Sequence, residues 1–257
     1  MLISIGLIIL IFFIVYFSSN ENRERIIVID AGHGGDANKF YYYNGDLFSG
    51  ATEDVTRLSK EINLSDNKVY YIERKLIGTD DENNRMHWLH IGDSGALSEF
   101  RGTKYSEKDI ILNISNFLSD LLRQSFKVIQ TREDDRYIFL DRRRSISNEN
   151  EADLFISVHL NSAEADCNNL DHTEVYYNNP AVQGLSKSIL NGLTSEFDFG
   201  EGFVKKKNDF VVLNNNRDSL LIEVNFICND KMARFLGNIS NQQRVAKIIS
   251  TEIMKAI

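Results

Sequence analysis

The sequence predicts an α/β protein, a single domain with a mostly parallel or mixed central sheet of about six strands and helices on both faces. Short apolar runs of strand length alternate with stretches of helical spacing through the second half of the chain. Several of these runs end in a histidine or contain a glutamate, and open α/β sheets build their sites where strands end. We also expect an N-terminal transmembrane helix and a large insertion.

The first 17 residues form one apolar stretch, M-L-I-S-I-G-L-I-I-L-I-F-F-I-V-Y-F. Its length reaches the lower limit for crossing a bilayer, roughly 17 residues. No Lys or Arg precedes it, and Tyr16 and Phe17 stand where a signal-peptidase site needs small residues. We therefore expect residues 1–17 to be a transmembrane anchor or an uncleaved signal, with a cleaved signal as the alternative. Residues 18–24 are a polar linker, and residues 25–257 form the main domain.

Regular structure begins with a predicted strand over Arg25–Asp30, followed by the sequence A-G-H-G-G, which contains His33. Residues 36–105 have no regular apolar pattern and contain clustered tyrosines, an acidic run and several glycines. We interpret this stretch as an insertion packed on the main domain, because its aromatic residues argue against disorder. Ser106 is a candidate N-cap for a helix that begins at Glu107 and continues with apolar residues at helical spacing.

The rest of the chain alternates strands and helices. Apolar runs predict strands over residues 126–131, 154–160, 173–177, 210–213 and 220–224. Polar or amphipathic stretches predict helices over residues 140–150, 181–196 and 242–257. Such alternation places helices on both faces of one sheet.

The composition excludes several classes of protein. Of the 257 residues 42% are hydrophobic, and the formal net charge of −8 argues against binding of nucleic acid through a basic surface. The two cysteines, Cys167 and Cys228, are too few for a disulfide scaffold or a Cys-rich zinc module. Whether they pair stays open, since the sequence gives no distance, although the apolar run around Cys228 favours a buried thiol.

Four residues are candidates for a site at the carboxyl edge of the sheet. His33 follows the first strand, His159 lies near the end of the strand over 154–160, and Glu107 opens a helix. Glu223 lies in the otherwise apolar strand over 220–224, where burying a carboxylate without a function is costly. Histidine and glutamate serve as metal ligands and as acids or bases, so these four residues indicate such chemistry at this edge.

These residues lie in several separated motifs that together resemble the zinc-dependent N-acetylmuramoyl-L-alanine amidases of bacterial cell walls. The matching segments are I-V-I-D-A-G-H-G-G (27–35), S-E-K-D-I-I-L-N-I (106–114), V-I-Q-T-R-E-D-D (128–135), L-D-R-R (140–143), A-D-L-F-I-S-V-H-L-N-S (152–162) and L-I-E-V-N-F-I-C-N (221–229). Their shared order is far more specific than any one of them. The resemblance implies that residues 25–257 are an amidase catalytic domain, in which residues 36–105 are an insertion atypical of the family.

The resemblance implies that His33, Glu107 and His159 bind Zn²⁺ and that Glu223 is the catalytic glutamate. Glu61 lies in the locally similar sequence K-E-I-N-L, but Glu107 is preferred because a long amphipathic helix follows it. Glu107 also has a purely structural interpretation, since an acid in the first turn of a helix favours the helix dipole.

Three further residues lie in the matching motifs. Asn161 follows the second histidine and is a candidate for binding substrate, with a structural role as the alternative. Arg132 and Arg142 are expected to bridge the ends of strands and helices through ion pairs or carbonyl contacts.

The resemblance predicts a zinc hydrolase that cleaves the amide between N-acetylmuramic acid and the L-alanine of the stem peptide. Its partners would be peptidoglycan, the cytoplasmic membrane through residues 1–17, and a regulatory protein at the 36–105 insertion. The catalytic domain would lie outside the cytoplasmic membrane, in the bacterial cell envelope. Two alternatives stay open: a zinc peptidase acting on cell-wall peptides, and a non-catalytic protein that binds peptidoglycan or recruits a partner.

Overall fold

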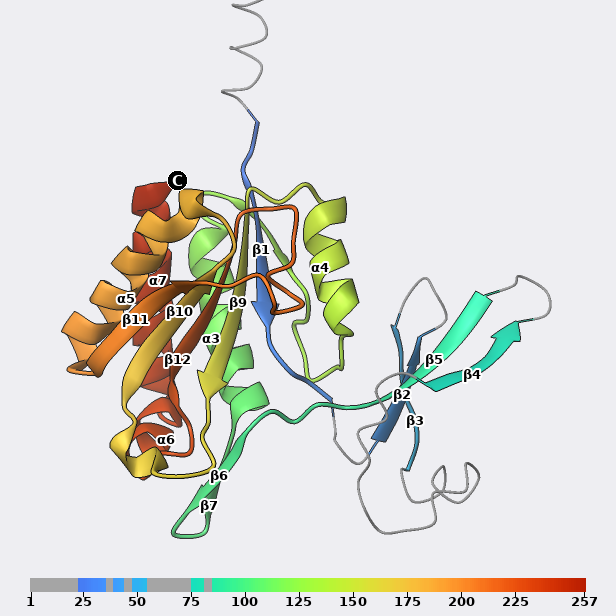
Figure 1. The fold of residues 1–257 in the computed structure, drawn as a ribbon, viewed down its shortest axis with the longest axis horizontal. Coiled ribbons are helices and arrows are strands. Elements are labelled where there is room, and N and C mark those ends of the chain that lie inside the picture. The colour runs from blue at the N-terminus through green and yellow to red at the C-terminus, as the bar shows by residue number, and fades with distance from the viewer. Residues whose placement is uncertain (1–22, 36–38, 44–47, 55–74, 81–84) are drawn as a thin grey trace, which may run out of the picture.

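A six-stranded mixed sheet in the order β11-β10-β12-β9-β1-β8 forms the centre of the molecule (Figure 1). The computed structural model describes residues 23–35, 39–43, 48–54, 75–80 and 85–257. Strands β1, β8, β9 and β12 are parallel, whereas β10 and β11 run in the opposite direction. The bounds are β1 Ile26–Ala31, β8 Lys127–Gln130, β9 Leu154–Asn161, β10 His172–Tyr177, β11 Gly200–Lys206 and β12 Ser219–Phe226.

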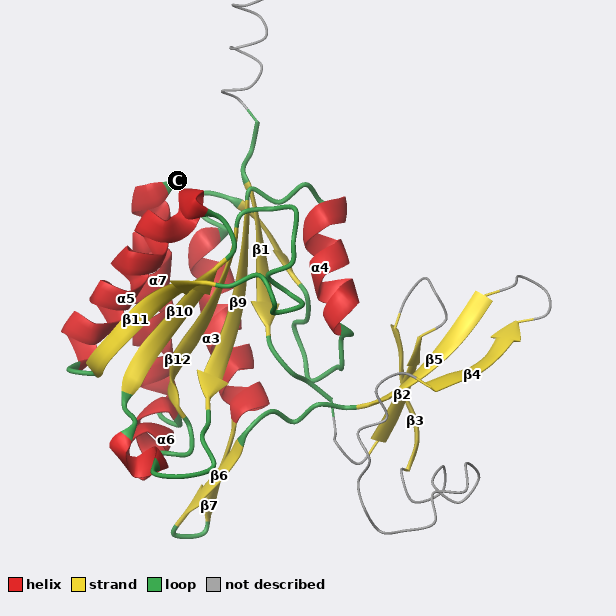
Figure 2. Ribbon diagram, in the orientation of Figure 1, coloured by secondary structure: helices red, strands yellow, loops and turns green. Residues whose placement is uncertain are grey.

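Helices cover both faces of this sheet, as the sequence predicts (Figure 2). Alternate strand residues point to opposite faces, so Ile27 and Ile29 pack with one set of helices and Val28 faces the other side. The larger core lies under α3 (Glu107–Leu122), α5 (Gln183–Phe197), α6 (Asp230–Leu236) and α7 (Ile239–Ala256). The smaller core lies under α4 (Leu140–Glu149) and the turn around Leu213.

Most predicted elements are found within a few residues of their expected bounds, but the strand predicted over Phe210–Leu213 is wrong. These residues form a turn, in which the Leu213 N–H donates to the Phe210 carbonyl at 3.0 Å. Val212 and Leu213 are buried in the smaller core, so the apolar run serves packing rather than strand pairing. The edge strand is instead β11, whose alternating exposed residues include Glu201 and Lys205.

The stretch interpreted as an insertion contains strands of its own. Strands β2 (Lys39–Tyr43), β3 (Phe48–Asp54), β4 (Lys75–Asp80) and β5 (Arg85–Ile91) form a separate antiparallel sheet in the order β3-β2-β5-β4. A hairpin of β6 (Leu97–Phe100) and β7 (Thr103–Ser106) then leads into α3.

The predicted anchor over residues 1–17 lies outside the described residues. In the described part of the chain, no helix is both long and apolar enough to cross a membrane.

The carboxylate of Asp30, at the end of β1, is completely buried beneath the sheet edge that carries His33. It accepts hydrogen bonds from Thr131 at 2.6 Å and Ser157 at 2.7 Å, and forms an ion pair of 2.7 Å with Arg143. Burial alone would raise the pKa of Asp30, but the charge of Arg143 and the two hydroxyls together lower it. Asp30 is therefore ionised inside the core.

Two buried arginines hold the turn that follows β1. Arg143 donates to the Ala31 carbonyl at 2.6 Å and also to the carbonyl of His33. Arg132 donates to the carbonyls of Ala31 at 2.9 Å and Gly32 at 2.7 Å. These bonds satisfy carbonyls that no strand partner reaches, and so fix the backbone that carries the histidine.

The structural role predicted for Arg132 agrees with these bonds, but the expectation for Arg142 is wrong. Arg142 forms an ion pair of 2.7 Å with Glu149 on the surface of the same helix, α4. Its neighbour Arg143 points into the core instead, because consecutive helical residues project about 100° apart.

We expect Arg143→Ala to destabilise the protein by about 3–5 kcal/mol, because it leaves the buried charge of Asp30 without its ion-pair partner. The measurement is the free energy of unfolding from guanidinium titration. Arg142→Ala is the matched control, and removal of its exposed pair should cost only about 0–1 kcal/mol. Equal losses for the two variants would contradict the role assigned to Arg143.

Candidate metal centre

Three side chains from separate elements converge at the carboxyl edge of the sheet. His33 follows β1, Glu107 is the first residue of α3, and His159 lies in β9. Nε2 of His33 lies 3.0 Å from Oε1 of Glu107 and 3.2 Å from Nδ1 of His159, and that Nδ1 lies 3.3 Å from the same Oε1. The structure therefore brings together the three residues predicted as metal ligands.

The geometry of this group fits a tetrahedral metal ion. Zinc bonds of roughly 2.0–2.2 Å place neighbouring tetrahedral ligand atoms about 3.4 Å apart, close to the separations observed here. Two imidazole nitrogens and one carboxylate oxygen are also ligands that zinc prefers. The rival candidate Glu61 lies outside the described residues.

Two glycines, Gly32 and Gly95, lie so close to the imidazoles of His33 and His159 that neither position has room for a side chain. A Cβ at Gly32 would lie 2.1 Å from the ring of His159. Gly95 has a left-handed backbone, and a Cβ there would lie 2.7 Å from Glu107 and 2.9 Å from the ring of His33. His33 is itself left-handed, with φ of 54°, a conformation that costs energy for a non-glycine residue. The buried arginines below it hold His33 in this conformation.

Both carboxylate oxygens of Glu107 are held by backbone N–H groups. Oε1 accepts from Leu160 at 2.9 Å and Oε2 accepts from Ala96 at 2.8 Å. Burial alone would raise the pKa of Glu107, but its contacts with His159 and His33 outweigh burial and hold the pKa far below its usual value. Glu107 is therefore an ionised, preoriented carboxylate, which a role in the helix dipole alone would not require.

His33 lies between two acids. Its Nε2 faces Glu107, whereas its Nδ1 lies 2.7 Å from Oδ2 of Asp93. Burial lowers the pKa of His33, but the two carboxylates together raise it to about 10. The electrostatics of the site thus favour positive charge at its centre.

Glu223 lies beside the three candidate ligands, on β12, which is parallel to β9. It is the register partner of His159 in the adjacent strand. Its Oε2 is buried and makes no hydrogen bond with the described residues. Burial raises the pKa of Glu223 to about 7, with the charge of His159 acting against the rise and Glu107 and Glu174 adding to it. This is a carboxylate with capacity for a proton near neutral pH.

A row of side chains extends from the candidate ligands across the same face of the sheet. His159, Glu223, Glu174 and Phe203 are successive register partners on β9, β12, β10 and β11. Glu174 accepts from Asn161 Nδ2 at 2.9 Å, and the Oδ1 of Asn161 accepts from the next backbone N–H at 2.8 Å. Phe203, at the sheet edge, is 40% exposed. The row thus leads from the candidate ligands to solvent.

Comparison with known proteins identifies the family. The model of the N-acetylmuramoyl-L-alanine amidase family, Amidase_3, matches residues 27–255. The chain belongs to this amidase family. The enzyme class and the family predicted from the sequence are therefore confirmed.

Individual relatives agree with this assignment. The amidase is 32% identical over 167 residues to the uncharacterized protein YqiI of Bacillus subtilis, covering 63% of this chain and 80% of that protein. It is 27% identical over 187 residues to the germination-specific N-acetylmuramoyl-L-alanine amidase of the same organism, covering 66% and 79% of the two chains. In sequence it is 26% identical to the CwlD amidase from Clostridioides difficile, whose structure is in complex with the GerS lipoprotein. The two structures superpose with a TM-score of 0.63, over 90% of this chain and 98% of that chain. AmiC2 of Nostoc punctiforme, 22% identical, shares the fold with a TM-score of 0.62 over 90% and 96% of the chains.

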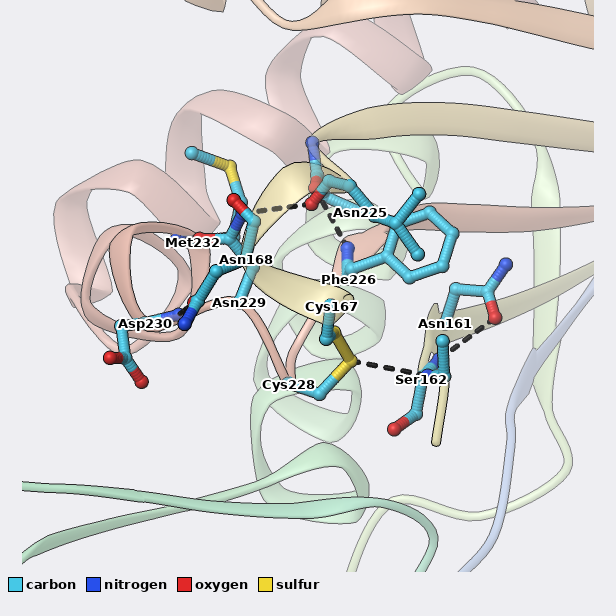
Figure 3. The surroundings of a disulfide bond; sticks show 12 residues. Asn161, Ser162, Cys167, Asn168, Asn225, Phe226, Cys228, Asn229, Asp230 and Met232 are labelled. Atoms are coloured by element: carbon cyan, nitrogen blue, oxygen red, sulfur yellow. Dashed lines mark hydrogen bonds between the residues drawn. A yellow bond between two sulfur atoms is a disulfide. The ribbon is translucent and has the colours of Figure 1, made fainter. Parts of the chain in front are cut away.

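A disulfide in the amidase joins the segments that follow two strands of the site (Figure 3). Cys167 lies in a short helix after β9 and Cys228 in the turn after β12, with Cα atoms 5.7 Å apart. The Ala163 N–H donates to the sulfur of Cys228 at 3.2 Å. The prediction that Cys228 is a buried free thiol is therefore wrong. The disulfide fixes the loops that follow the strands of His159 and Glu223.

Sequence reasoning missed Asp93, Ala96 and Glu174, which all contact residues of the site. Glu174 carried a usable signal, since it is an acid within the strand-like run H-T-E-V-Y-Y, as Glu223 is within its own strand. Asp93 and Ala96 lie in the stretch interpreted as insertion, where only the short sequence G-D-S-G-A suggested a tight turn.

We expect Glu223→Gln to stabilise the metal-free amidase above pH 7. The folded-state pKa of about 7 exceeds the usual 4.5, so between these values the folded protein binds a proton that the unfolded chain has lost. Stability therefore falls as the pH rises through this range, by at most about 3 kcal/mol, and the amide removes that loss.

The measurement is guanidinium unfolding at pH 5 and pH 8 in the presence of a chelator. The gain should be about 1–3 kcal/mol at pH 8 and much smaller at pH 5. Glu201→Gln, on the exposed side of β11, should change neither value appreciably. No gain for Glu223→Gln at pH 8 would contradict the raised pKa.

Proposed function

We propose that the chain is a zinc-dependent amidase that hydrolyses the bond between the lactyl group of N-acetylmuramic acid and the L-alanine of the stem peptide. The observation that carries the proposal is the convergence of His33, Glu107 and His159 beside Glu223, whose buried Oε2 has no hydrogen-bond partner among the described residues. The three ligand atoms would hold the ion. The separations between them, and their chemistry, support zinc.

The chain's own residues provide the remaining chemistry. A zinc ion with an open position polarises an amide carbonyl and lowers the pKa of water to roughly 7. Glu223 would accept the proton of the attacking water on its free carboxylate oxygen and deliver it to the nitrogen of the leaving L-alanine. Its raised pKa suits both steps near neutral pH.

Asn161 is proposed to bind the substrate. Its amide is locked between Glu174 and a backbone N–H, and its Nδ2 group carries a second hydrogen that could donate to a substrate carbonyl. Glu174 holds this amide in place, and accepts in addition from Tyr176 at 2.6 Å. Asn161 would therefore act as a preoriented donor rather than as a flexible side chain.

The proposed location is the bacterial cell envelope, with residues 1–17 in the cytoplasmic membrane and the catalytic domain outside it, where peptidoglycan lies. The disulfide supports an oxidising compartment, since such bonds are rare in the cytosol. A regulatory protein would bind the segment over residues 36–105. A relative provides a precedent, since the CwlD amidase forms a complex with the GerS lipoprotein.

We expect the purified protein to bind one equivalent of zinc and to release soluble products from dye-labelled sacculi. Glu223→Gln should keep the metal but lower the rate by roughly 100- to 10,000-fold, because it loses the proton acceptor. His159→Ala should lose both metal and activity. Zinc content is measured by atomic emission, and mass spectrometry of the products should show free stem peptides that begin with L-alanine.

Glu201→Gln is the matched control for charge, and should keep wild-type zinc content and rate. Cleaved cross-links in place of free stem peptides would favour a zinc peptidase. A metal-free wild type whose dye release is unchanged by Glu223→Gln would overturn the hydrolytic assignment.

A further inference from the structure

Asp93 contacts the outer side of a candidate ligand. Its Oδ2 accepts a hydrogen bond from Nδ1 of His33 at 2.7 Å, while Nε2 of the same ring faces Glu107 and His159. We propose that Asp93 is a positioning residue, which keeps the proton of His33 on Nδ1 and directs the Nε2 lone pair at the metal ion. The inference rests on the proposed zinc function.

Asp93 is itself fixed by its backbone. The Gly34 N–H donates to the Asp93 carbonyl at 2.7 Å, and the Asp93 N–H donates to the Gly34 carbonyl at 3.0 Å. Its second carboxylate oxygen accepts from the Gly95 N–H at 3.0 Å. One oxygen is thus used to hold the residue, and the other is left for the imidazole of His33.

This carboxylate has a specific task because a neutral imidazole can carry its proton on either nitrogen. The tautomer with a proton on Nε2 cannot bind a metal through that atom. A carboxylate hydrogen-bonded to Nδ1 selects the competent tautomer, orients the ring and raises its basicity, and such partners typically contribute 10- to 100-fold in metal affinity. His159 is restrained differently, by the close approach of Gly32 to its ring.

The geometry separates this role from that of a fourth ligand. Asp93 bonds the nitrogen on the far side of the ring from Glu107 and His159, so its carboxylate faces away from the ion. Its side chain is also half exposed, with 49% of its surface accessible. A replacement there should therefore affect the imidazole far more than the packing of the core.

The test compares Asp93→Asn with Asp135→Asn in the full-length protein. Asp135 accepts from the Gly35 N–H at 2.9 Å and pairs with Lys108, so it restrains the same loop without bonding the imidazole. Zinc affinity is measured by competition with a chromophoric chelator at pH 7.5, and the unfolding of the metal-free proteins is followed in parallel. We expect zinc binding 10- to 100-fold weaker in Asp93→Asn and within about threefold of wild type in Asp135→Asn.

Equal zinc affinity in wild type and Asp93→Asn would overturn the proposal. So would a loss of equal size in Asp135→Asn, because it would trace the effect to the loop rather than to the imidazole. A wild type without zinc would instead refute the proposed function. Crystal structures of metal-free wild type and Asp93→Asn then judge the positioning role alone: a rotated His33 ring in the variant supports it, and an unchanged ring overturns it.

Discussion

The buried ion pair between Asp30 and Arg143 is the interaction on which the site depends. Strand β1 ends at the sheet edge, and the chain must then turn into a left-handed residue, His33, without strand partners for its carbonyl groups. Arg143 satisfies two of these carbonyls and Arg132 two, with Ala31 shared between them. Arg143 lies this deep in the core and requires a compensating anion, which Asp30 supplies from inside the sheet. The same contacts thus pair the buried charge of Arg143 and hold the backbone of the first histidine.

Several acidic side chains lie close together at the sheet edge above this ion pair. Glu107 and Glu174 are buried and Glu223 has a buried oxygen, yet their environments differ. Glu107 is surrounded by N–H groups and imidazoles, which keep its pKa far below the usual value. Within the described part of the chain, Oε2 of Glu223 accepts no hydrogen bond, and burial raises the pKa of Glu223 to about 7. Neighbouring carboxylates whose pKa values differ this much suit different roles. The ionised Glu107 suits a metal ligand, whereas Glu223 suits a group that takes up and releases a proton. The cost of burying Glu223 without a partner is consistent with selection for activity over stability.

The sequence was sufficient for the parts of the molecule governed by local periodicity. Helix α3 begins at the expected Glu107, and β9 and β12, which bring His159 and Glu223 side by side, are both strands that apolar runs predicted. The sequence was insufficient where a role depends on which of two adjacent helical residues faces the core, or on a contact between residues far apart in the chain. Arg142 and Arg143 are adjacent in a polar helix, and only the position of Asp30 distinguishes them. Asp93 lies 60 residues from His33 behind an irregular stretch, so no spacing rule could connect them.

The backbone pairing of Gly34 with Asp93 explains how the candidate metal site tolerates the segment between these two residues. Two backbone hydrogen bonds close the ends of that segment, immediately beyond the candidate ligand His33 on one side and at its partner Asp93 on the other. The entropy of closing a flexible loop grows slowly with length, by about 0.6 kcal/mol for each doubling, so a long segment costs little more than a short one once its ends are fixed. A second sheet, β2 to β5, therefore occupies the segment while His33 and Asp93 stay in contact.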